Sequence, residues 1–142
     1  MSRSYPQRPI VGVGVVVVHD NKVLLIRRGK PPRQGQWSLP GGAQKLGETV
    51  FDAGQREVFE ETGLLVDTIE HLAVVDLIER DADGAIRYHY TLVDLLATSP
   101  TGEAVADSDA TEVAWFTVGE IDTMPLWNET RRIIMLALKP PK

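Results

Sequence analysis

The chain has 142 residues, of which 43% are hydrophobic and 25% are charged, and we expect one compact domain over residues 1–142. It contains no cysteine, which excludes disulfides, thiolate metal ligands and cysteine nucleophiles. A net charge of −5 argues against broad binding to nucleic acids, and no apolar run approaches the ~20 residues of a membrane span. The N-terminus also lacks the apolar segment of a signal peptide, so we expect a cytoplasmic protein that binds neither nucleic acids nor membranes.

The first half of the chain begins with a predicted β-hairpin. Residues 1–9 are polar and contain two prolines, which predicts a loose tail. Ile10–His19 is apolar almost throughout, as expected of a strand that is buried on both faces. An Asp-Asn pair at 20–21 is a turn signal, and Lys22–Arg28 then predicts the second strand.

Two features of this hairpin bear on function. Gly12 and Gly14 lack the third glycine and the following helix of a dinucleotide-binding fold, so they indicate close packing or a bulge. Arg27, Arg28 and Lys30 form a cationic cluster where the second strand ends and a Pro/Gly/Gln loop begins. Clustered cations of this kind can hold phosphate, and Arg28 is the candidate substrate contact among them.

The strongest chemical signal is an acidic helix. Thr49–Thr62 has no proline, and Gly63 follows where a left-handed residue would end a helix of about four turns. On such a helix Glu57, Glu60 and Glu61 fall within an arc of roughly 100°. Like charges at these spacings destabilise an isolated helix, so a cation is predicted. All-oxygen ligands suit Mg²⁺ or Mn²⁺. An EF-hand calcium site is disfavoured because its acids would lie on an irregular loop.

The same helix has a small face. Ala53 and Gly54, one turn before the acids, leave room for another backbone to approach, and we expect the Gly41-Gly42 pair to occupy it. The opposite side, which we expect to face the core, carries Phe51, Val58 and Thr62.

The second half of the chain predicts three strands and a terminal helix. Asp67–Arg80 and Ala85–Ala97 are β-rich runs joined by a turn at 81–84, and Thr111–Phe116 is a short strand. The polar stretch Thr98–Asp109 is long enough to be a functional or mobile loop. Leu126–Leu138 predicts the terminal helix, with Arg131 and Arg132 on its polar side. Structural or solvent-facing roles are favoured for His71, His89, Tyr88 and Tyr90.

The spacing of the acidic helix and the loop before it resembles a known family. Gly42, Glu48 and the run Arg56–Leu64 match GX5EX7REUXEEXGU, the Nudix box with U a bulky aliphatic residue, at every fixed position. Trp37–Gly41 also resembles the lead-in that is usual in the family. The resemblance implies an α/β fold, the Nudix-type α/β/α sandwich with a mixed β-sheet between helices. It also implies a hydrolase of nucleoside diphosphates joined to another group.

The resemblance assigns roles residue by residue. It implies that Glu57, Glu60 and Glu61 bind Mg²⁺, or Mn²⁺, together with the Gly41 carbonyl. Arg56 would brace this cluster, and Gly42 and Glu48 would support the corner between loop and helix. Some family members use the Glu57 position as the general base, while others use an acid from a late loop. That loop offers Glu103, Asp107, Asp109 and Glu112, and we assign Glu112 or a neighbour alongside Glu57.

The substrate is left open among three classes. ADP-ribose or a related ADP-sugar comes first, because the GQWSLPGG lead-in resembles small bacterial members of that group. An oxidised or non-standard nucleoside triphosphate is the runner-up, since Asn128 falls near a base-reading asparagine of relatives that cleave triphosphates. A non-catalytic nucleotide-binding regulator is the third, although such domains commonly lose residues of the box. The expected partner is therefore a small nucleotide, and both a monomer and a homodimer fit the sequence.

Overall fold

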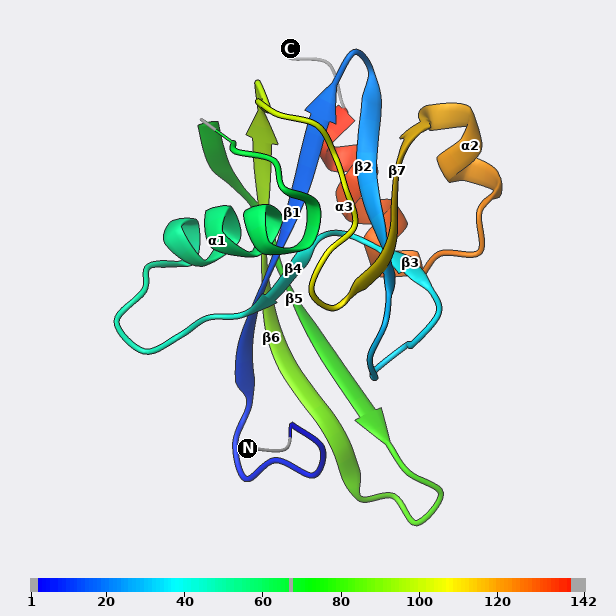
Figure 1. The fold of residues 1–142 in the computed structure, drawn as a ribbon. Coiled ribbons are helices and arrows are strands. Elements are labelled where there is room, and N and C mark those ends of the chain that lie inside the picture. Colours follow the sequence, from blue (N-terminus) through cyan, green and yellow to red (C-terminus); the bar gives the residue numbers. More distant parts are fainter. Residues whose placement is uncertain (1–2, 67, 139–142) are drawn as a thin grey trace.

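The computed structural model describes residues 3–66 and 68–138 of the chain (Figure 1). Three helices accompany the strands: α1 (Val50–Thr62), α2 (Val118–Thr123) and α3 (Asn128–Leu138). The strands are β1 (Ile10–His19), β2 (Lys22–Arg28), β3 (Trp37–Ser38), β4 (Gly41–Ala43), β5 (Thr68–Arg80), β6 (Ile86–Thr98) and β7 (Ala110–Thr117).

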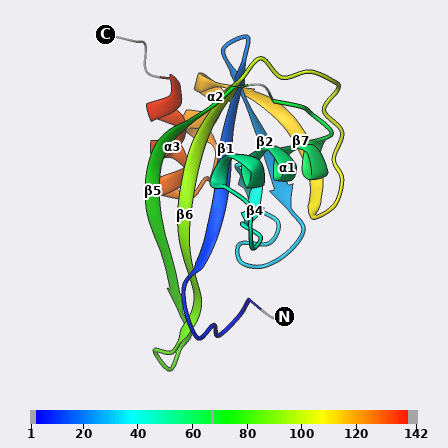
Figure 2. The ribbon, with the colours of Figure 1, turned by 90° about the vertical axis from the view of Figure 1, so that its left-hand side faces the viewer.

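Strand β1 is the centre of the sheet. It runs parallel to β6 and antiparallel to both β2 and β4, so the sheet is mixed. The strand order is β3-β2-β1-β6-β5, with β4 paired to β1 and β7 paired to β2. Figure 2 shows α1 on one side of these strands and α3 on the other. The predicted sandwich with a mixed sheet between helices is therefore confirmed.

The apolar run of β1 is buried because both of its faces are covered. Val15 and Val17 pack with Val58 of α1, whereas Val16 packs with Ile133 and other residues of α3. Successive side chains of a strand point to opposite faces, so one run of valines supplies both halves of the core. This arrangement explains why Ile10–His19 shows no alternation of apolar and polar residues.

The first hairpin has the predicted bounds. Asp20 and Asn21 both adopt positive φ, at 51° and 61°, as a two-residue hairpin turn requires. The close packing expected at the two glycines is also present. A Cβ at Gly12 would lie 2.7 Å from Leu92, and one at Gly14 would lie 2.6 Å from Asp94.

Later strands agree with the predicted ones to within about a residue. The strand expected over Asp67–Arg80 begins at Thr68, and Asp67 itself lies outside the described residues. The strand expected over Ala85–Ala97 runs from Ile86 to Thr98. In the turn between them, the Asp81 carboxylate accepts hydrogen bonds from the Asp83 and Ala85 backbone amides, each 3.0 Å long.

The region after β7 differs most from the prediction. Helix α2 was not expected, yet Thr117 and Glu120 form a capping box at its start. Helix α3 begins at Asn128 rather than Leu126. In the part of the chain that the structure describes, no helix has the length and apolar character needed to cross a membrane.

The N-terminal segment is held more firmly than a loose tail. Residues 3–9 contain no helix or strand. The Tyr5 amide nevertheless donates to the Arg87 carbonyl at 2.7 Å, and the Tyr5 hydroxyl donates to the Asp81 carboxylate at 2.8 Å. This segment is therefore tied to the end of the β5–β6 hairpin, while residues 1–2 lie outside the described part.

Candidate active site

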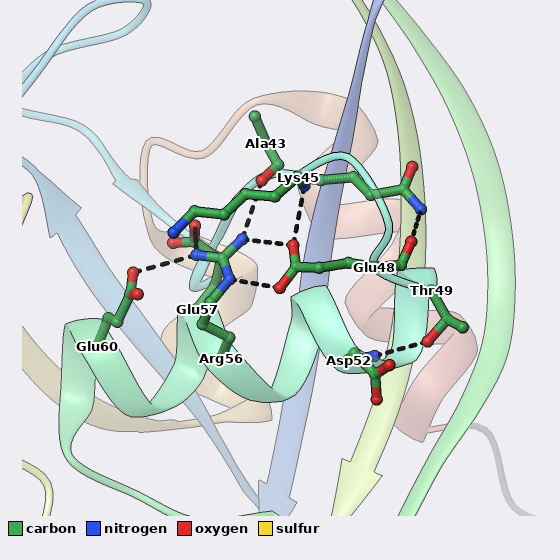
Figure 3. A network of polar contacts seen from close by, with 9 residues as sticks. Ala43, Lys45, Glu48, Thr49, Asp52, Arg56, Glu57 and Glu60 are labelled. Atoms are coloured by element: carbon green, nitrogen blue, oxygen red, sulfur yellow. Dashed lines mark hydrogen bonds and ion pairs between the residues drawn. The ribbon is translucent and has the colours of Figure 1, made fainter.

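Helix α1 is defined by its two ends. At the first, the Thr49 hydroxyl accepts from the Asp52 amide at 3.0 Å, so Thr49 caps the helix and Val50 begins it (Figure 3). At the other, Gly63 has φ 75° and its amide donates to the Phe59 carbonyl at 2.8 Å. The predicted left-handed end of the helix is confirmed, and the acidic residues lie on its last two turns.

The small face of α1 packs on the sheet. A Cβ at Gly54 would lie 3.1 Å from both Val15 and Leu95, and Ala53 beside it is fully buried. The expectation that the Gly41-Gly42 pair fills this face is therefore wrong. The reason is that those glycines form β4 and pair with β1 instead.

The predicted core-facing stripe is partly correct. Val58 and Thr62 are fully buried, but Phe51 is only half-buried and its ring lies 4.7 Å from the His71 ring. The buried side of α1 carries Ala53, Gly54, Val58, Glu61 and Thr62. This side includes small residues because the helix lies very close to the strands of the sheet. One of the acids, Glu61, lies on this buried side.

The glycine pair brings β4 against both β1 and the acids. Gly41 lies opposite Gly14, where a Cβ at Gly41 would be only 2.0 Å from the Val13 carbonyl oxygen. A Cβ at Gly42 would lie 2.5 Å from Cδ of Glu57. Any side chain at either position would displace the strand or the carboxylate, so both positions require glycine.

Glu57 and Glu61 meet beside this strand. Glu61 is only 4% exposed, and its Oε2 accepts from the Gly41 amide at 3.3 Å. Burial, and then the charge of Glu57, raise the pKa of Glu61 well above its usual range, although the Gly41 amide and Arg28 act the other way. Two carboxylates thus lie side by side, and Glu61, the buried one, has no ion pair among the described residues.

Arg56 joins Glu57 to the loop that precedes the helix (Figure 3). Its Nε lies 2.7 Å from Glu48 Oε2, and its Nη1 lies 2.7 Å from Glu57 Oε1. A third bond, 3.1 Å long, runs from Nη2 to the Ala43 carbonyl. The hydrogen bond from Arg56, followed by one from the Lys45 amide, lowers the pKa of Glu48 to about 2. Arg56 and Glu48 therefore tie the strand, the loop and the helix together at one corner.

Glu60 lies apart from the other two acids. Its Oε2 lies 3.2 Å from Nη1 of Arg56, and its side chain is 40% exposed. Among the residues that the structure describes, no three acidic or histidine side chains are grouped closely enough to hold a metal ion. The donors nevertheless fit a divalent cation, because the Glu57–Glu61 pair supplies oxygen ligands and an excess of negative charge. Glu60 stands at the edge of this pair.

A cavity of about 610 Å³ opens beside the pair. Arg28 lines it, as expected of a substrate contact, and its Nε donates to the Pro32 carbonyl at 2.7 Å. Other cations on the lining are Arg3, Lys30 and Arg33, and apolar or aromatic walls come from Leu77, Tyr88, Tyr90, Leu92 and Trp127. The cavity therefore joins an acidic end to a part with basic and aromatic side chains.

Glu48, Arg56 and Glu60 are not on this lining, and neither are two predicted residues from the second half of the chain, Glu112 and Asn128. Glu112 lies on β7, where it is 54% exposed and its Oε1 is 3.1 Å from Nη1 of Arg27. Asn128 is exposed at the first position of α3, although its neighbours Trp127 and Glu129 both line the cavity. Of the four acids proposed in the late loop and strand, Asp109 is the one that reaches the cavity.

Asp94 was missed by the sequence analysis. It lies on β6, is 6% exposed and lines the cavity. Burial raises its pKa to about 7. The signal was present in the alternation of the strand, because Tyr88, Tyr90 and Leu92 precede it at every second position and share its face. An acid on an otherwise apolar face of a predicted strand indicates a candidate functional residue.

Comparisons with known proteins agree with this geometry. A family model described as the NUDIX domain matches residues 8–137. The chain is 35% identical over 121 residues to the ADP-ribose pyrophosphatase of Methanocaldococcus jannaschii, which covers 85% of this chain and 69% of that protein. It is 34% identical over 111 residues to the 8-oxo-dGDP phosphatase of Mus musculus, which covers 75% of this chain but 31% of that protein.

A solved structure has the same fold. The crystal structure of the MutT NUDIX hydrolase from Burkholderia pseudomallei superposes with a TM-score of 0.80 at 32% identity, covering 92% of this chain and 98% of that one. The intact box, the sandwich around it and these matches show that the chain belongs to the Nudix hydrolases, enzymes that act on small nucleotides and generally use divalent metal ions.

Proposed function

We propose that this Nudix hydrolase cleaves the diphosphate linkage of a nucleoside diphosphate derivative, with ADP-ribose or a related ADP-sugar as its substrate and Mg²⁺ as its metal. One observation carries the proposal. The pair of Glu57 and the buried Glu61 lies against the glycines of β4, and both residues line a cavity that Arg28 also lines. Oxygen ligands next to a cationic side chain suit a metal–diphosphate group.

Some side chains of the site would bind the metal, and others keep these ligands in position. Glu57 and Glu61 would bind the cation, with Glu60 and the Gly41 carbonyl completing the protein ligands. When bound, the divalent ion neutralises the diphosphate and activates water. Arg56 keeps Glu57 in place, since its Nη1 lies 2.7 Å from the carboxylate. Mn²⁺ satisfies the same ligands and is the second choice of metal.

The general base is either Glu57 or an acid of the long loop or of the strand that follows it. We retain both candidates. Among the acids of the late loop and strand, we prefer Asp109 to Glu112, because Asp109 lines the cavity and Glu112 does not. Asp109 lines the cavity and its Oδ1 lies 2.9 Å from Nζ of Lys30. Asp109→Asn should lower kcat with nearly unchanged metal affinity, whereas Glu57→Gln should weaken both. If single variants of Glu103, Asp107, Asp109 and Glu112 all retain near-native kcat, Glu57 becomes the leading candidate for the base.

The choice of substrate is supported by the similarity to the archaeal ADP-ribose pyrophosphatase, which covers 85% of this chain. The similarity to the mouse 8-oxo-dGDP phosphatase supports an oxidised nucleotide as the second candidate. Asn128, which suggested that alternative from the sequence, is exposed and does not line the cavity.

Turnover of a nucleotide panel tests the proposal. The panel contains ADP-ribose, an ADP-hexose, 8-oxo-dGTP, 8-oxo-dGDP and the normal triphosphates, each with Mg²⁺ or Mn²⁺, and products are separated by chromatography. We expect ADP-ribose to give AMP and ribose 5-phosphate. Glu61→Gln should abolish this reaction, while Glu70→Gln, which alters an exposed acid on β5, should not. Preferential cleavage of an oxidised nucleotide would reject the ADP-sugar assignment.

A further inference from the structure

One face of β6 differs from an ordinary cavity wall. Tyr88, Tyr90, Leu92 and Asp94 occupy alternate positions of the strand, and all four line the cavity. The first three are apolar or aromatic, whereas the fourth places a carboxyl group among them. The mechanism described above makes no use of Asp94, although it is 6% exposed and its exposed part faces the cavity.

The sheet sets the distance between Asp94 and the acidic pair. Gly14 lies between them, because it is opposite Asp94 on β6 and opposite Gly41 on β4. Two strand spacings put the backbones of Asp94 and Gly41 roughly 10 Å apart. A Cβ at Gly14 would lie 2.6 Å from Asp94 Oδ1, so the missing side chain at Gly14 makes room for the carboxyl group. A nucleoside whose diphosphate lies near Gly41 can span this distance.

The surroundings of Asp94 favour a neutral carboxyl group. Burial raises its pKa to about 7, Glu129 also raises it, and Arg132 lowers it. Arg132 is itself paired with Glu129, its Nη2 lying 2.7 Å from Glu129 Oε2. No hydrogen bond within the described residues reaches the Asp94 side chain. A neutral carboxyl group offers one donor and one acceptor, and a buried polar group with no partner is costly.

We propose that Asp94 is a specificity-determining residue that binds the amino edge of an adenine base lying against the cavity wall of Tyr88, Tyr90 and Trp127. The 6-amino group donates to the carboxyl C=O, and the carboxyl O–H donates to the neighbouring ring nitrogen. Guanine presents two adjacent N–H donors on its pairing edge and fits the ionised carboxylate instead. This inference rests on the proposed function, because the metal–diphosphate site locates the nucleoside.

Other roles for Asp94 have less support. As a ligand of the same ion as Glu57 and Glu61, it would have to reach across two strand spacings, roughly 10 Å between the backbones of Asp94 and Gly41. As a structural partner of Arg132 it would need an ion pair, yet that arginine is paired with Glu129. The position within the apolar wall of the cavity is the feature that a base contact explains.

Binding of nucleoside monophosphates without any divalent ion tests the proposal. Affinities for AMP, IMP, GMP and CMP are measured by calorimetry in EDTA, so that the metal site does not contribute. The natural protein should bind AMP about tenfold or more tightly than IMP or GMP. Asp94→Asn should keep this preference, because an amide also offers one donor and one acceptor. Asp94→Val should bind all four about equally.

The controls separate a base contact from a structural effect. Asp76→Asn changes an exposed aspartate on the neighbouring strand β5 and should leave every affinity unchanged. Melting temperatures show whether each variant is folded. If Asp94→Val does not fold, the test rests on two measurements, the AMP preference of the natural protein and that of Asp94→Asn. A preference for GMP or CMP, no preference at all, or an AMP preference that survives in Asp94→Val overturns the inference.

The proposed function fails in a different way. Hydrolysis of ADP-ribose with Mg²⁺ is assayed separately on the same preparations. If ADP-ribose is cleaved but the base preference does not depend on Asp94, the function stands and the base contact is wrong. If AMP binding depends on Asp94 but no ADP-sugar is cleaved, the base contact stands and the substrate assignment is wrong.

Discussion

Helix α1 contacts two carboxylates with opposite electrostatics, Glu48 from the loop before it and Glu61 from its own last turn. At one corner, Glu48 is paired with Arg56, and this pairing lowers the pKa of Glu48 to about 2. On the other side, burial and the charge of Glu57 raise the pKa of Glu61. The first environment is balanced by the protein itself and therefore stabilises the fold. In the second, Glu61 has no ion pair among the described residues, so a bound cation would be stabilised there at the expense of the metal-free protein.

The largest expected effect comes from removing the charge of Glu61. Glu61→Gln should lower turnover by orders of magnitude, because the proposed metal ligand would lose its charge. The same change should raise the melting temperature of the metal-free protein, since it relieves burial of a charge beside Glu57. An activity assay checks the turnover, and scanning calorimetry with and without Mg²⁺ checks the melting temperature. Unchanged turnover together with unchanged metal affinity would contradict the assignment of Glu61 as a ligand.

The pH dependence of stability follows from the unbalanced acids. The pKa of Asp94 rises from 3.8 to about 7 on folding, so the folded protein binds more protons between these values. Its free energy of unfolding should therefore fall as the pH rises from about 4 to about 7, by at most about 4 kcal/mol for this group. Glu61 acts in the same direction. Asp94→Asn should flatten the curve in urea titrations, and an unchanged slope would show that Asp94 does not titrate in this window.

Arg56 tests the balanced environment. Arg56→Ala would leave Glu48 and Glu57 without their partner and should lower the free energy of unfolding by more than the loss of one exposed ion pair does, because several charge-assisted hydrogen bonds are lost together. Arg132→Ala is the matched control, because it removes an arginine that pairs with Glu129 on the surface. That change should cost no more than about 1 kcal/mol. If Arg56→Ala and Arg132→Ala lower the free energy of unfolding equally in denaturant titrations, the ion pairs around Glu48 stabilise the fold no more than a surface pair does.

Gly54 tests the close contact between α1 and the sheet. Gly54→Leu should destabilise the protein by about 1 to 3 kcal/mol, because its Cβ alone would lie 3.1 Å from Val15 and Leu95. Gln55→Leu places the same side chain at an exposed position of the same helix and should have little effect. A higher melting temperature for Gly54→Leu would show that helix propensity outweighs packing at this position.

Local patterns predicted much of this molecule. The bounds of β1 and β2, the glycine that ends α1 and the spacing of the box are each encoded within a few consecutive residues. The partner of Gly54 was predicted wrongly because it depends on pairing between distant segments. Strand β1 takes both β4 and β6 as neighbours, and neither pairing has a signal inside β1.

The cavity side of the site shows the same limit. The acids of α1 were identified because helical spacing places them together. Asp94 reaches the cavity only because β6 lies parallel to β1, with Asp94 opposite Gly14. Helix α2 was missed because its six residues are too few to show a helical period, although its capping box can be read from the sequence.

The tethered N-terminal segment matters for anyone who purifies this enzyme. Tyr5 holds the segment to the β5–β6 hairpin, and Arg3 and Ser4 line the cavity. An affinity tag fused ahead of residue 1 would be joined to the chain two residues before Arg3. A tag rich in histidine would also bring imidazole groups that bind divalent ions. Kinetic work is better done with the tag removed.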